Sequence, residues 1–198
     1  MGKPSTPQPA DINLKKSTMI SISIDHKTVI RQLALEDAEA LLALVDDDRA
    51  HLRQWLPWVD GTQTLEDQRG FIEMGLAQHR ADNGFHAGIW YENRLAGTIG
   101  IHYLDRKNRS TSIGYWLHSS VVGHGLATQA SRALISHLFH VENMNRVEIT
   151  CAVDNHRSRA IPLRLGAKEE GVRRQCEWLY DHFVDHVIYS IIAAEWTG

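Results

Sequence analysis

The chain has 198 residues and a mass of 22.4 kDa, which corresponds to about one domain. With 21 Lys and Arg against 24 Asp and Glu, its formal charge of −3 excludes a surface built throughout for a nucleic-acid backbone. A hydrophobic content of 43% excludes global disorder, and no apolar run approaches the ~18 residues that span a bilayer. The two cysteines, Cys151 and Cys176, show no CxxC spacing, so we expect reduced, packed thiols in a cytoplasmic protein without nucleic-acid or membrane partners.

The beginning of the chain differs in composition from the rest. Three of the five prolines fall within residues 1–9, among Ser, Thr and Gln, and such a composition neither starts a helix nor supplies a core. The segment also lacks the apolar stretch of a signal peptide. We therefore expect a disordered tail at 1–17 and one domain at 18–198.

The first part of the domain begins with strands and continues with helices. Isoleucines alternate with polar residues over 20–24, and an apolar stretch follows at 29–33, which predicts paired strands. An apolar stripe with acidic residues in its first turn predicts a helix at 36–45. After the tryptophan-rich segment 51–58, a Thr-x-x-Asp capping box predicts a second helix at 64–80.

Three strand candidates occupy the middle of the chain. They cover residues 85–91, 95–103 and 110–118, and the segments between them, 92–94 and 105–109, have the composition of turns. Because both connections are short, we expect these three strands to run antiparallel.

After residue 118 the period of the pattern changes. Apolar side chains recur at helical spacing over 127–141 and then at period two over 147–153. A strand, a helix and a strand form a βαβ unit, so the strands at 110–118 and 147–153 should be parallel. A shorter helix and two more strands follow at 158–165, 167–177 and 183–193. The predicted fold class is α+β, with helices packed on a mixed sheet.

Histidine pairs provide no predicted metal centre. His137 and His140 lie one turn apart on a predicted helix, and His182 and His186 share one face of a predicted strand. Neither pair has a third ligand at a known spacing, and the chain contains no HExxH sequence. We expect structural or surface histidines and no bound metal.

The most informative segment is Val122-Gly-His-Gly-Leu-Ala-Thr128, which links a predicted strand to a predicted helix. Glycines let the backbone turn sharply and approach a ligand. A helix N-terminus offers unpaired N–H groups and the positive end of a dipole, and His124 adds charge when it is protonated. The segment therefore predicts an anion site.

A dinucleotide site fits this segment poorly. The GxGxxG pattern needs a third glycine where this chain has Thr128, and an acidic residue ~20 positions on where it has Asn145. The strands before the segment also form an antiparallel meander. A pyrophosphate in another cofactor is the better interpretation.

At this segment the chain resembles the GNAT superfamily of N-acetyltransferases, whose signature is Q/R-x-x-G-x-G/A. Gly125 and Ala127 match, and Val122 replaces the usual Gln or Arg. The resemblance implies acetyl-CoA as cofactor and a single GNAT-like domain, with a mostly antiparallel central sheet and helices on both faces. The implied cofactor contacts are Leu117, His118, Gly123, His124, Gly125, Leu126, Ala127, Thr128 and Asn155.

A second stretch resembles the family's N-x-x-S/A motif. Asn155 and Ser158 occupy its polar positions, although Ala167 replaces the usual aromatic residue after the glycine. The resemblance implies that Asn155 bonds the pantetheine arm, whereas Asn and Ser also favour turns and helix caps. Many members carry a tyrosine as general acid where this chain has Pro162, so that acid is excluded. If Ser158 caps the helix, Pro162 lies near its first turn, where proline is tolerated.

Within the superfamily the chain resembles the RimL-type protein N-terminal acetyltransferases over residues 20–196. The segments that carry this resemblance, besides the two cofactor motifs, are 51–58, 113–117 and 175–179. It implies an N-terminal α-amine of a protein as acceptor, a ribosomal protein among the candidates, and a homodimer.

The same resemblance implies Ser158 as general acid and Glu177 as general base acting through water. The chemistry fits, because an α-amine with a pKa of ~8 is already partly neutral near pH 7.5, and the departing thiolate needs a proton. Backbone N–H groups at the end of the 110–118 strand are candidates for the oxyanion donor. A surface role for Glu177 is the alternative.

Aromatic side chains are candidates for the acceptor pocket. Trp55, Trp58, Tyr115 and Trp116 either form its walls or pack in the core. Two other functions stay open: acetylation of a small amine such as an aminoacyl-type antibiotic, and a non-catalytic acyl-CoA-binding module.

Overall fold

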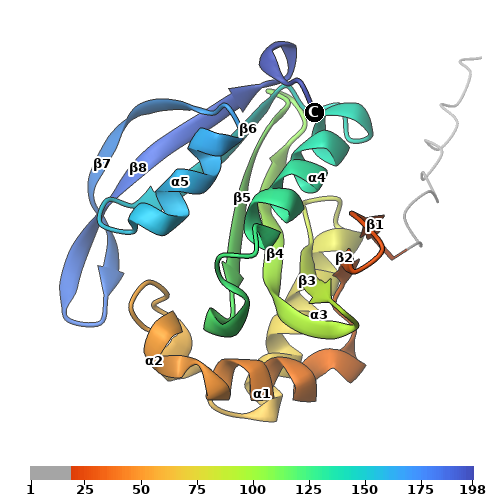
Figure 1. Cartoon of the computed structure of the whole chain (residues 1–198), viewed down its shortest axis with the longest axis vertical. Coiled ribbons are helices and arrows are strands. Elements are labelled where there is room, and N and C mark those ends of the chain that lie inside the picture. Colours follow the sequence, from red (N-terminus) through yellow and green to blue (C-terminus); the bar gives the residue numbers. More distant parts are fainter. Residues whose placement is uncertain (1–18) are drawn as a thin grey trace, which may run out of the picture.

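The computed structural model describes residues 19–198, so the tail expected at 1–17 lies outside the described residues. Eight strands form one sheet in the order β1-β2-β3-β4-β5-β6-β8-β7 (Figure 1). The strands are β1 (Ser21–Ser23), β2 (Thr28–Gln32), β3 (His86–Tyr91), β4 (Arg94–Asp105), β5 (Ser110–Leu117), β6 (Arg146–Ala152), β7 (Lys168–Leu179) and β8 (His182–Ile192). The helices are α1 (Ala38–Asp47), α2 (Arg49–Leu52), α3 (Leu65–Arg80), α4 (Leu126–His140) and α5 (His156–Arg164).

The pairing of the strands confirms the predicted α+β fold. The expected N-terminal pair and the meander β3-β4-β5 are antiparallel, and β5 pairs with β6 in parallel across the α4 connection. The capping box of α3 is present, because Asp67 N–H donates to Thr64 Oγ1 at 3.2 Å and Asp67 Oδ2 accepts from Thr64 N–H at 2.8 Å.

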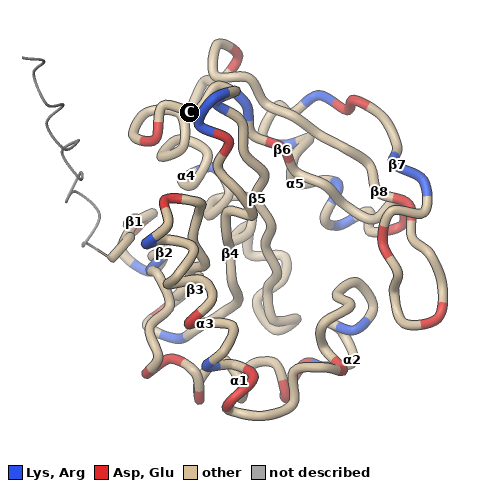
Figure 2. Tube along the Cα trace, turned by 180° about the vertical axis from the view of Figure 1, so that it is seen from behind, with Lys and Arg blue, Asp and Glu red and all other residues tan. Residues whose placement is uncertain are grey.

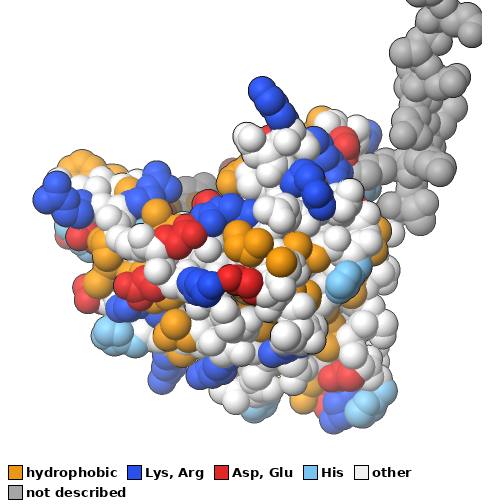
Figure 3. Space-filling view, turned by 90° about the horizontal axis from the view of Figure 1, so that it is seen from above, with side chains coloured by type: hydrophobic (Ala, Val, Ile, Leu, Met, Phe, Trp, Pro, Cys, Tyr) orange, Lys and Arg blue, Asp and Glu red, His pale blue; other side chains and the backbone are white. Residues whose placement is uncertain are grey.

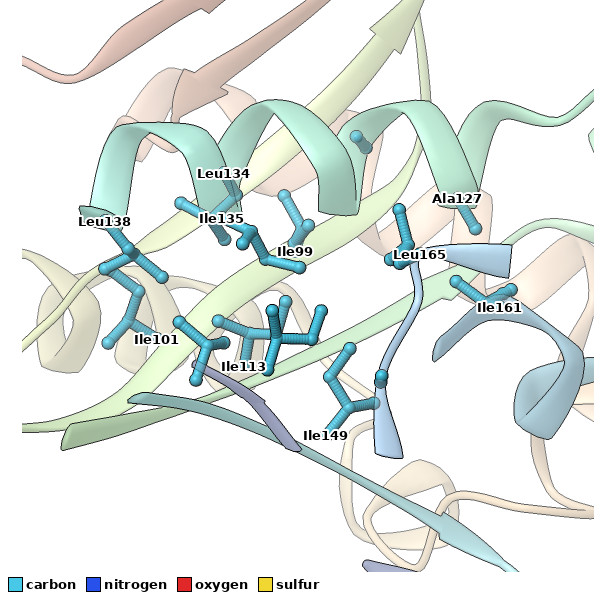
Figure 4. Close-up of a cluster of buried hydrophobic side chains, with 14 of the residues drawn as sticks. Ile99, Ile101, Ile113, Ala127, Leu134, Ile135, Leu138, Ile149, Ile161 and Leu165 are labelled. Carbon is cyan, nitrogen blue, oxygen red and sulfur yellow. The ribbon is translucent and has the colours of Figure 1, made fainter. Parts of the chain in front are cut away.

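Helices cover both faces of the sheet. On one face α4 and α5 point apolar side chains at β4, β5 and β6 (Figure 4). Ile99, Leu134, Ile135 and Leu138 in this cluster are all fully buried. On the other face α1 and α3 pack on a smaller cluster made of Leu33, Ala38, Leu41, Ile72 and Leu95. The main core therefore lies beneath α4, beside the predicted anion loop.

The sheet divides between its two parallel strands. β5 and β6 pair over Ser110–Ile113 and Arg146–Ile149, and both strands then continue without pairing to each other. Side chains alternate along β5, so Ile113, Tyr115 and Leu117 join the core beneath α4 while Trp116 packs toward α1. A wedge thus opens at the carboxyl ends of these strands.

Helix α5 begins earlier than the predicted 158–165. Asn155 rather than Ser158 is its cap, because Asn155 Oδ1 accepts the Ser158 N–H at 3.1 Å. Pro162 consequently lies inside the helix instead of near its first turn. Proline has no N–H, so the Ser158 carbonyl lacks its intrahelical donor. The Tyr115 hydroxyl donates to that carbonyl at 3.4 Å.

Surface charges of both signs are interspersed along the trace and on the face shown in space-filling form (Figures 2 and 3). Of the helices between residues 19 and 198, none is long and apolar enough to cross a membrane. Over the same range, no group of three or more His, Cys, Asp or Glu side chains is placed to hold a metal ion. Both cysteines are free, but the expectation of two packed thiols is wrong for Cys176, which is exposed on the edge strand β7.

An ion-pair network joins β6, β7 and β8. Arg146 donates to Glu148 at 2.8 Å and to Glu170 at 2.7 Å, and Ser190 Oγ donates to Glu170 at 2.7 Å. Hydrogen bonds from Arg146 and Ser190 lower the pKa of Glu170 to about 2. The contribution of the Arg146–Glu170 pair to this network depends on Glu170 being ionised.

Arg146→Gln is expected to lower the free energy of unfolding near neutral pH, by about 1 kcal/mol or less because the pair is partly exposed to solvent. A carboxylate whose pKa is lowered on folding contributes its stability above the unfolded pKa. The difference between variant and wild type should therefore shrink as the pH falls from 4.5 toward 2. Urea unfolding at several pH values measures it, with Arg173→Gln as the control, and a constant difference would contradict it.

Candidate active site

A cleft of about 1390 Å³ occupies the wedge between β5 and β6. Of the predicted site residues, Leu117, Gly123, Gly125, Leu126, Ala127, Thr128, Asn155, Ser158, Glu177, Trp55, Trp58 and Tyr115 line it. Its walls also include residues of α1, α3 and β4 on the face opposite α4. The cleft thus reaches both faces of the sheet through the opening between the strands.

The glycine loop is shaped to expose backbone at the start of α4. Gly123 and Gly125 have φ of +95° and +78°, in the left-handed region that favours glycine. A Cβ on Gly123 would meet nothing within 4 Å, and one on Gly125 only Gln129 Nε2 at 3.6 Å. Gly125 caps α4 without a side-chain hydrogen bond, so no capping side chain occupies the first N–H groups of the helix, and the residues of this first turn line the cleft. This arrangement suits an anion.

Two residues of the predicted cofactor set, His118 and His124, do not line the cleft. His118 is buried and bonds Asp47 Oδ2 at 3.1 Å, while the adjacent Ser119 N–H donates to Asp48 at 2.7 Å. These contacts tie the end of β5 to α1 and α2. The ring of His124 lies 6.2 Å from that of Tyr91, centroid to centroid.

Ser158, in the first turn of α5, lines the cleft. Its hydroxyl donates to the sulfur of Cys151 at 3.2 Å, and Cys151 itself lines the cleft at the end of β6. Burial raises the pKa values of both Cys151 and Tyr115, so the thiol and the phenol stay neutral. Ser158 thus lines the cleft with a weak acceptor as the partner of its hydroxyl.

Glu177 faces the cleft because β7 is distorted just before it. The register shifts between Arg173 and Glu177, Gln175 adopts a φ of +49°, and its N–H donates to Asp185 Oδ1 at 2.7 Å. Bulges of this kind re-aim side chains beside functional sites. Glu177 Oε2 is 3.1 Å from His186 Nε2, and both side chains are mostly buried.

Aromatic residues gather on the wall formed by the segment after α2. The rings of Trp58 and Trp116 are 5.9 Å apart. The Tyr180 hydroxyl, in the β7–β8 turn, donates to the Leu56 carbonyl at 2.6 Å, and Arg53 lies over the Tyr180 ring at 3.9 Å. This contact, the α2–hairpin bridge, joins two parts of the chain that approach each other in Figure 1 although they are far apart in sequence.

The family model described as "Acetyltransferase (GNAT) domain" matches residues 27–168. The chain belongs to the GNAT acetyltransferase family. The ribosomal-protein-serine acetyltransferase of Escherichia coli (strain K12) is 30% identical over 87% of this chain and 96% of its own length. The YdaF protein of Bacillus subtilis (strain 168) is 36% identical over 91% of this chain and 99% of its own length.

Solved GNAT acetyltransferase structures show the same fold. RimL, a ribosomal L7/L12 α-N-protein acetyltransferase in complex with coenzyme A, superposes with a TM-score of 0.84 at 28% identity, over 87% of this chain and 98% of that one. The microcin C7 self-immunity acetyltransferase MccE, in complex with acetyl-CoA and AMP, gives a TM-score of 0.82 at 28% identity, over 85% and 94% of the two chains. This GNAT enzyme is therefore an acetyltransferase of the RimL/RimJ ribosomal-protein type.

Sequence reasoning missed four cleft residues of this GNAT enzyme: His86, His102, Cys151 as a partner of Ser158, and His186 as a partner of Glu177. Burial lowers the pKa of His86 to about 4 and also lowers the pKa of His102. The sequence does contain one signal for His86 and His102. Gly100 and Gly114 lie inside predicted strands, and a glycine in a strand marks the close approach of another group.

Proposed function

We propose that this acetyltransferase transfers the acetyl group of acetyl-CoA to the N-terminal α-amine of a protein, with ribosomal proteins as the leading class of acceptor. The observation that carries the proposal is the placing of Ser158 and Glu177 on one cleft with the glycine loop. Two relatives that this chain matches over nearly their whole length are named for acetylation of ribosomal proteins, which supports this class of acceptor. On the same grounds we place the enzyme in the cytoplasm, where ribosomal proteins are made.

The residues of the cleft fit acetyl-CoA. The open approach to Gly123 and Gly125 suits a pyrophosphate at the start of α4. Asn155 Oδ1 is already used to cap α5, which leaves its amide N–H groups for the pantetheine arm. When bound, acetyl-CoA supplies an activated acetyl group as a thioester.

Two side chains act as general base and general acid in the transfer. Glu177 takes a proton from the amine through a water molecule, and His186 holds the carboxylate in place at 3.1 Å. Ser158 gives a proton to the departing sulfur and recovers one from solvent, to which Glu177 returns the proton that it accepted. The unpaired N–H groups of β5 beyond Ile113 are the candidate donors to the oxyanion.

Gly125→Asp is expected to abolish the rise in melting temperature that acetyl-CoA causes in the wild type. A ligand that binds only the native state must raise that temperature. The aspartate adds a carboxylate where the phosphate approaches, at a φ that disfavours side chains. Thermal unfolding with and without acetyl-CoA measures the effect, and Gly61→Asp, outside the cleft, is the control. An unchanged shift in Gly125→Asp would remove the loop from the cofactor site.

The direct test of the acceptor is mass spectrometry of a peptide library and of ribosomal proteins incubated with the enzyme and acetyl-CoA. A mass gain of one acetyl group on N-terminal residues supports the proposal. Acetylation confined to lysine side chains, or to no peptide at all, contradicts it.

A small amine is the second candidate acceptor. The aromatic wall with Trp55, Trp58 and Trp116, and the likeness to MccE in complex with AMP, favour an aminoacyl-type compound. Including an aminoacyl adenylate analogue in the same assay separates the two acceptors by their relative kcat/KM.

The enzyme is expected to be a homodimer at micromolar concentration. Static light scattering measures this directly, because a dimer has twice the 22.4 kDa mass of the single chain. A mass near that of one chain would contradict the expectation without bearing on the reaction.

A further inference from the structure

Two glycines form a flat floor on the sheet face opposite α4. Gly100 of β4 and Gly114 of β5 are direct cross-strand partners, and His86 of β3 pairs with Gly100. A Cβ on Gly100 would lie 2.7 Å from His86 Nδ1, and one on Gly114 would lie 2.5 Å from His102 Nε2. The two imidazoles therefore occupy the space that side chains would take at these positions.

His102 reaches this place through a bulge in β4. Ile101 pairs with Ile113 and Tyr103 pairs with Ser112, so His102 is left over between them. The extra residue turns its side chain across Gly114. Gly114 directly follows Ile113, the last β5 residue paired with β6, so the ring lies where the sheet divides.

The surroundings of His102 leave one nitrogen for a ligand. Its Nδ1 is 3.4 Å from Ser112 Oγ, while Nε2 lies over Gly114 without a hydrogen bond to any described residue. The ring lines the cleft with one side covering Gly114, while the residue as a whole keeps part of its surface exposed. Beside it His86 packs on the Phe71 ring at 4.9 Å. In the tautomer that donates from Nδ1 to Ser112, the Nε2 lone pair faces the cleft.

Glu177 and His186 lie on the same face, across the wedge from His102. Ile113 and Ile149 are paired and both belong to the core beneath α4, so the Thr150 side chain points to the other face, where the His102 ring covers Gly114. Thr150 of β6 pairs with Ile188 of β8. His186 is two residues from Ile188 on β8, so its side chain lies on the same face as that of Thr150. Each side of the wedge therefore carries a proton-accepting side chain that a bulge aims, His102 on one side and Glu177 on the other.

We propose that His102 binds the acceptor, its Nε2 accepting a hydrogen bond from the reacting amino group. The proposal deepens the proposed function and rests on it. A neutral amine has two N–H groups and one lone pair. If one N–H is held from the Glu177 side and the other by His102, the lone pair stays free for attack on the thioester carbon. Neutral imidazole suits this role, and the lowered pKa of His102 favours that form.

The test is steady-state kinetics of His102→Phe and His102→Gln with an amine that the wild type acetylates. Phenylalanine keeps the ring over Gly114 but has no acceptor atom, whereas the glutamine carbonyl oxygen restores one. His102→Phe should raise the acceptor KM roughly tenfold, the value of one hydrogen bond to a bound ligand. It should leave the acetyl-CoA KM and melting temperature unchanged. His102→Gln should stay within about threefold of wild type, and His140→Phe, exposed at the end of α4, is the control.

Equal acceptor KM values in His102→Phe and wild type would overturn the proposal, as would a parallel rise in both KM values, which indicates a structural role. If His102→Phe does not fold, His102→Asn, too short to reach the amine, takes its place with the same expected rise. If the proposed function is wrong, the wild type acetylates a small amine and no protein N-terminus. That small amine then serves as the acceptor in the His102 kinetics, so the two failures are distinguished.

Discussion

Glu177→Gln is expected to lower turnover about 100-fold at pH 7, the lower end of the range for removing a general base. The deficit should shrink as the pH rises, because a more alkaline solution supplies the neutral α-amine without help once the pH passes the amine pKa of ~8. The amide keeps the size of the side chain and a polar contact to His186, so the bulge before it should survive. A pH–rate profile from pH 6 to 9.5 measures the effect.

The matched control is Glu169→Gln, a carboxylate on the same strand that does not line the cleft. It should leave both turnover and its pH dependence unchanged. If Glu177 serves only to order β7, its variant loses melting temperature instead, and its activity deficit is the same at every pH. A pH–rate profile parallel to that of the wild type would therefore reject the general-base role and leave the cofactor site untouched.

Ser158→Ala should also lower kcat about 100-fold, with little change in the affinity for acetyl-CoA. The proton from its hydroxyl matters only as the sulfur leaves, so the loss falls on the transition state. In the resting enzyme the hydroxyl contacts the Cys151 thiol, a weak acceptor, so its removal should barely affect stability. Single-turnover kinetics together with acetyl-CoA binding distinguish the two quantities.

Ser131→Ala is the control for this variant. Its hydroxyl is buried in α4 and has no hydrogen-bond partner among the described residues, so removing it should leave turnover unchanged. A weaker affinity of Ser158→Ala for acetyl-CoA, at unchanged kcat, would show that Ser158 binds the cofactor and is not the acid.

Local patterns were sufficient to predict much of this molecule. The periodicity after residue 118 gave the parallel pairing of β5 and β6, and the Thr64 capping box gave the start of α3. The glycine loop was predicted because its chemistry lies within seven consecutive residues at a helix N-terminus. Each of these signals is contained in a single stretch of chain, where spacing alone determines geometry.

Contacts between distant segments escaped prediction. No local pattern predicts that Asp47 and Asp48, 71 residues away, bond His118 and Ser119. The position of His102 depends on a bulge, and strand register is set by tertiary packing that a single sequence does not reveal. A Ser158 cap would place Pro162 near the first turn of α5, whereas the helix is capped about one turn earlier, at Asn155, and Pro162 lies inside it.

The α2–hairpin bridge sets a limit on the width of whatever enters the cleft. Leu56 and Glu177 belong to different walls, and the Tyr180 hydrogen bond and the stacked Arg53 tie those walls together. Spreading them breaks both contacts, at a cost of about 1–2 kcal/mol. A slender chain end enters without that cost, whereas an amine on the side of a folded domain brings bulk that forces the walls apart. We therefore expect the enzyme to prefer acceptors whose reacting end is slender.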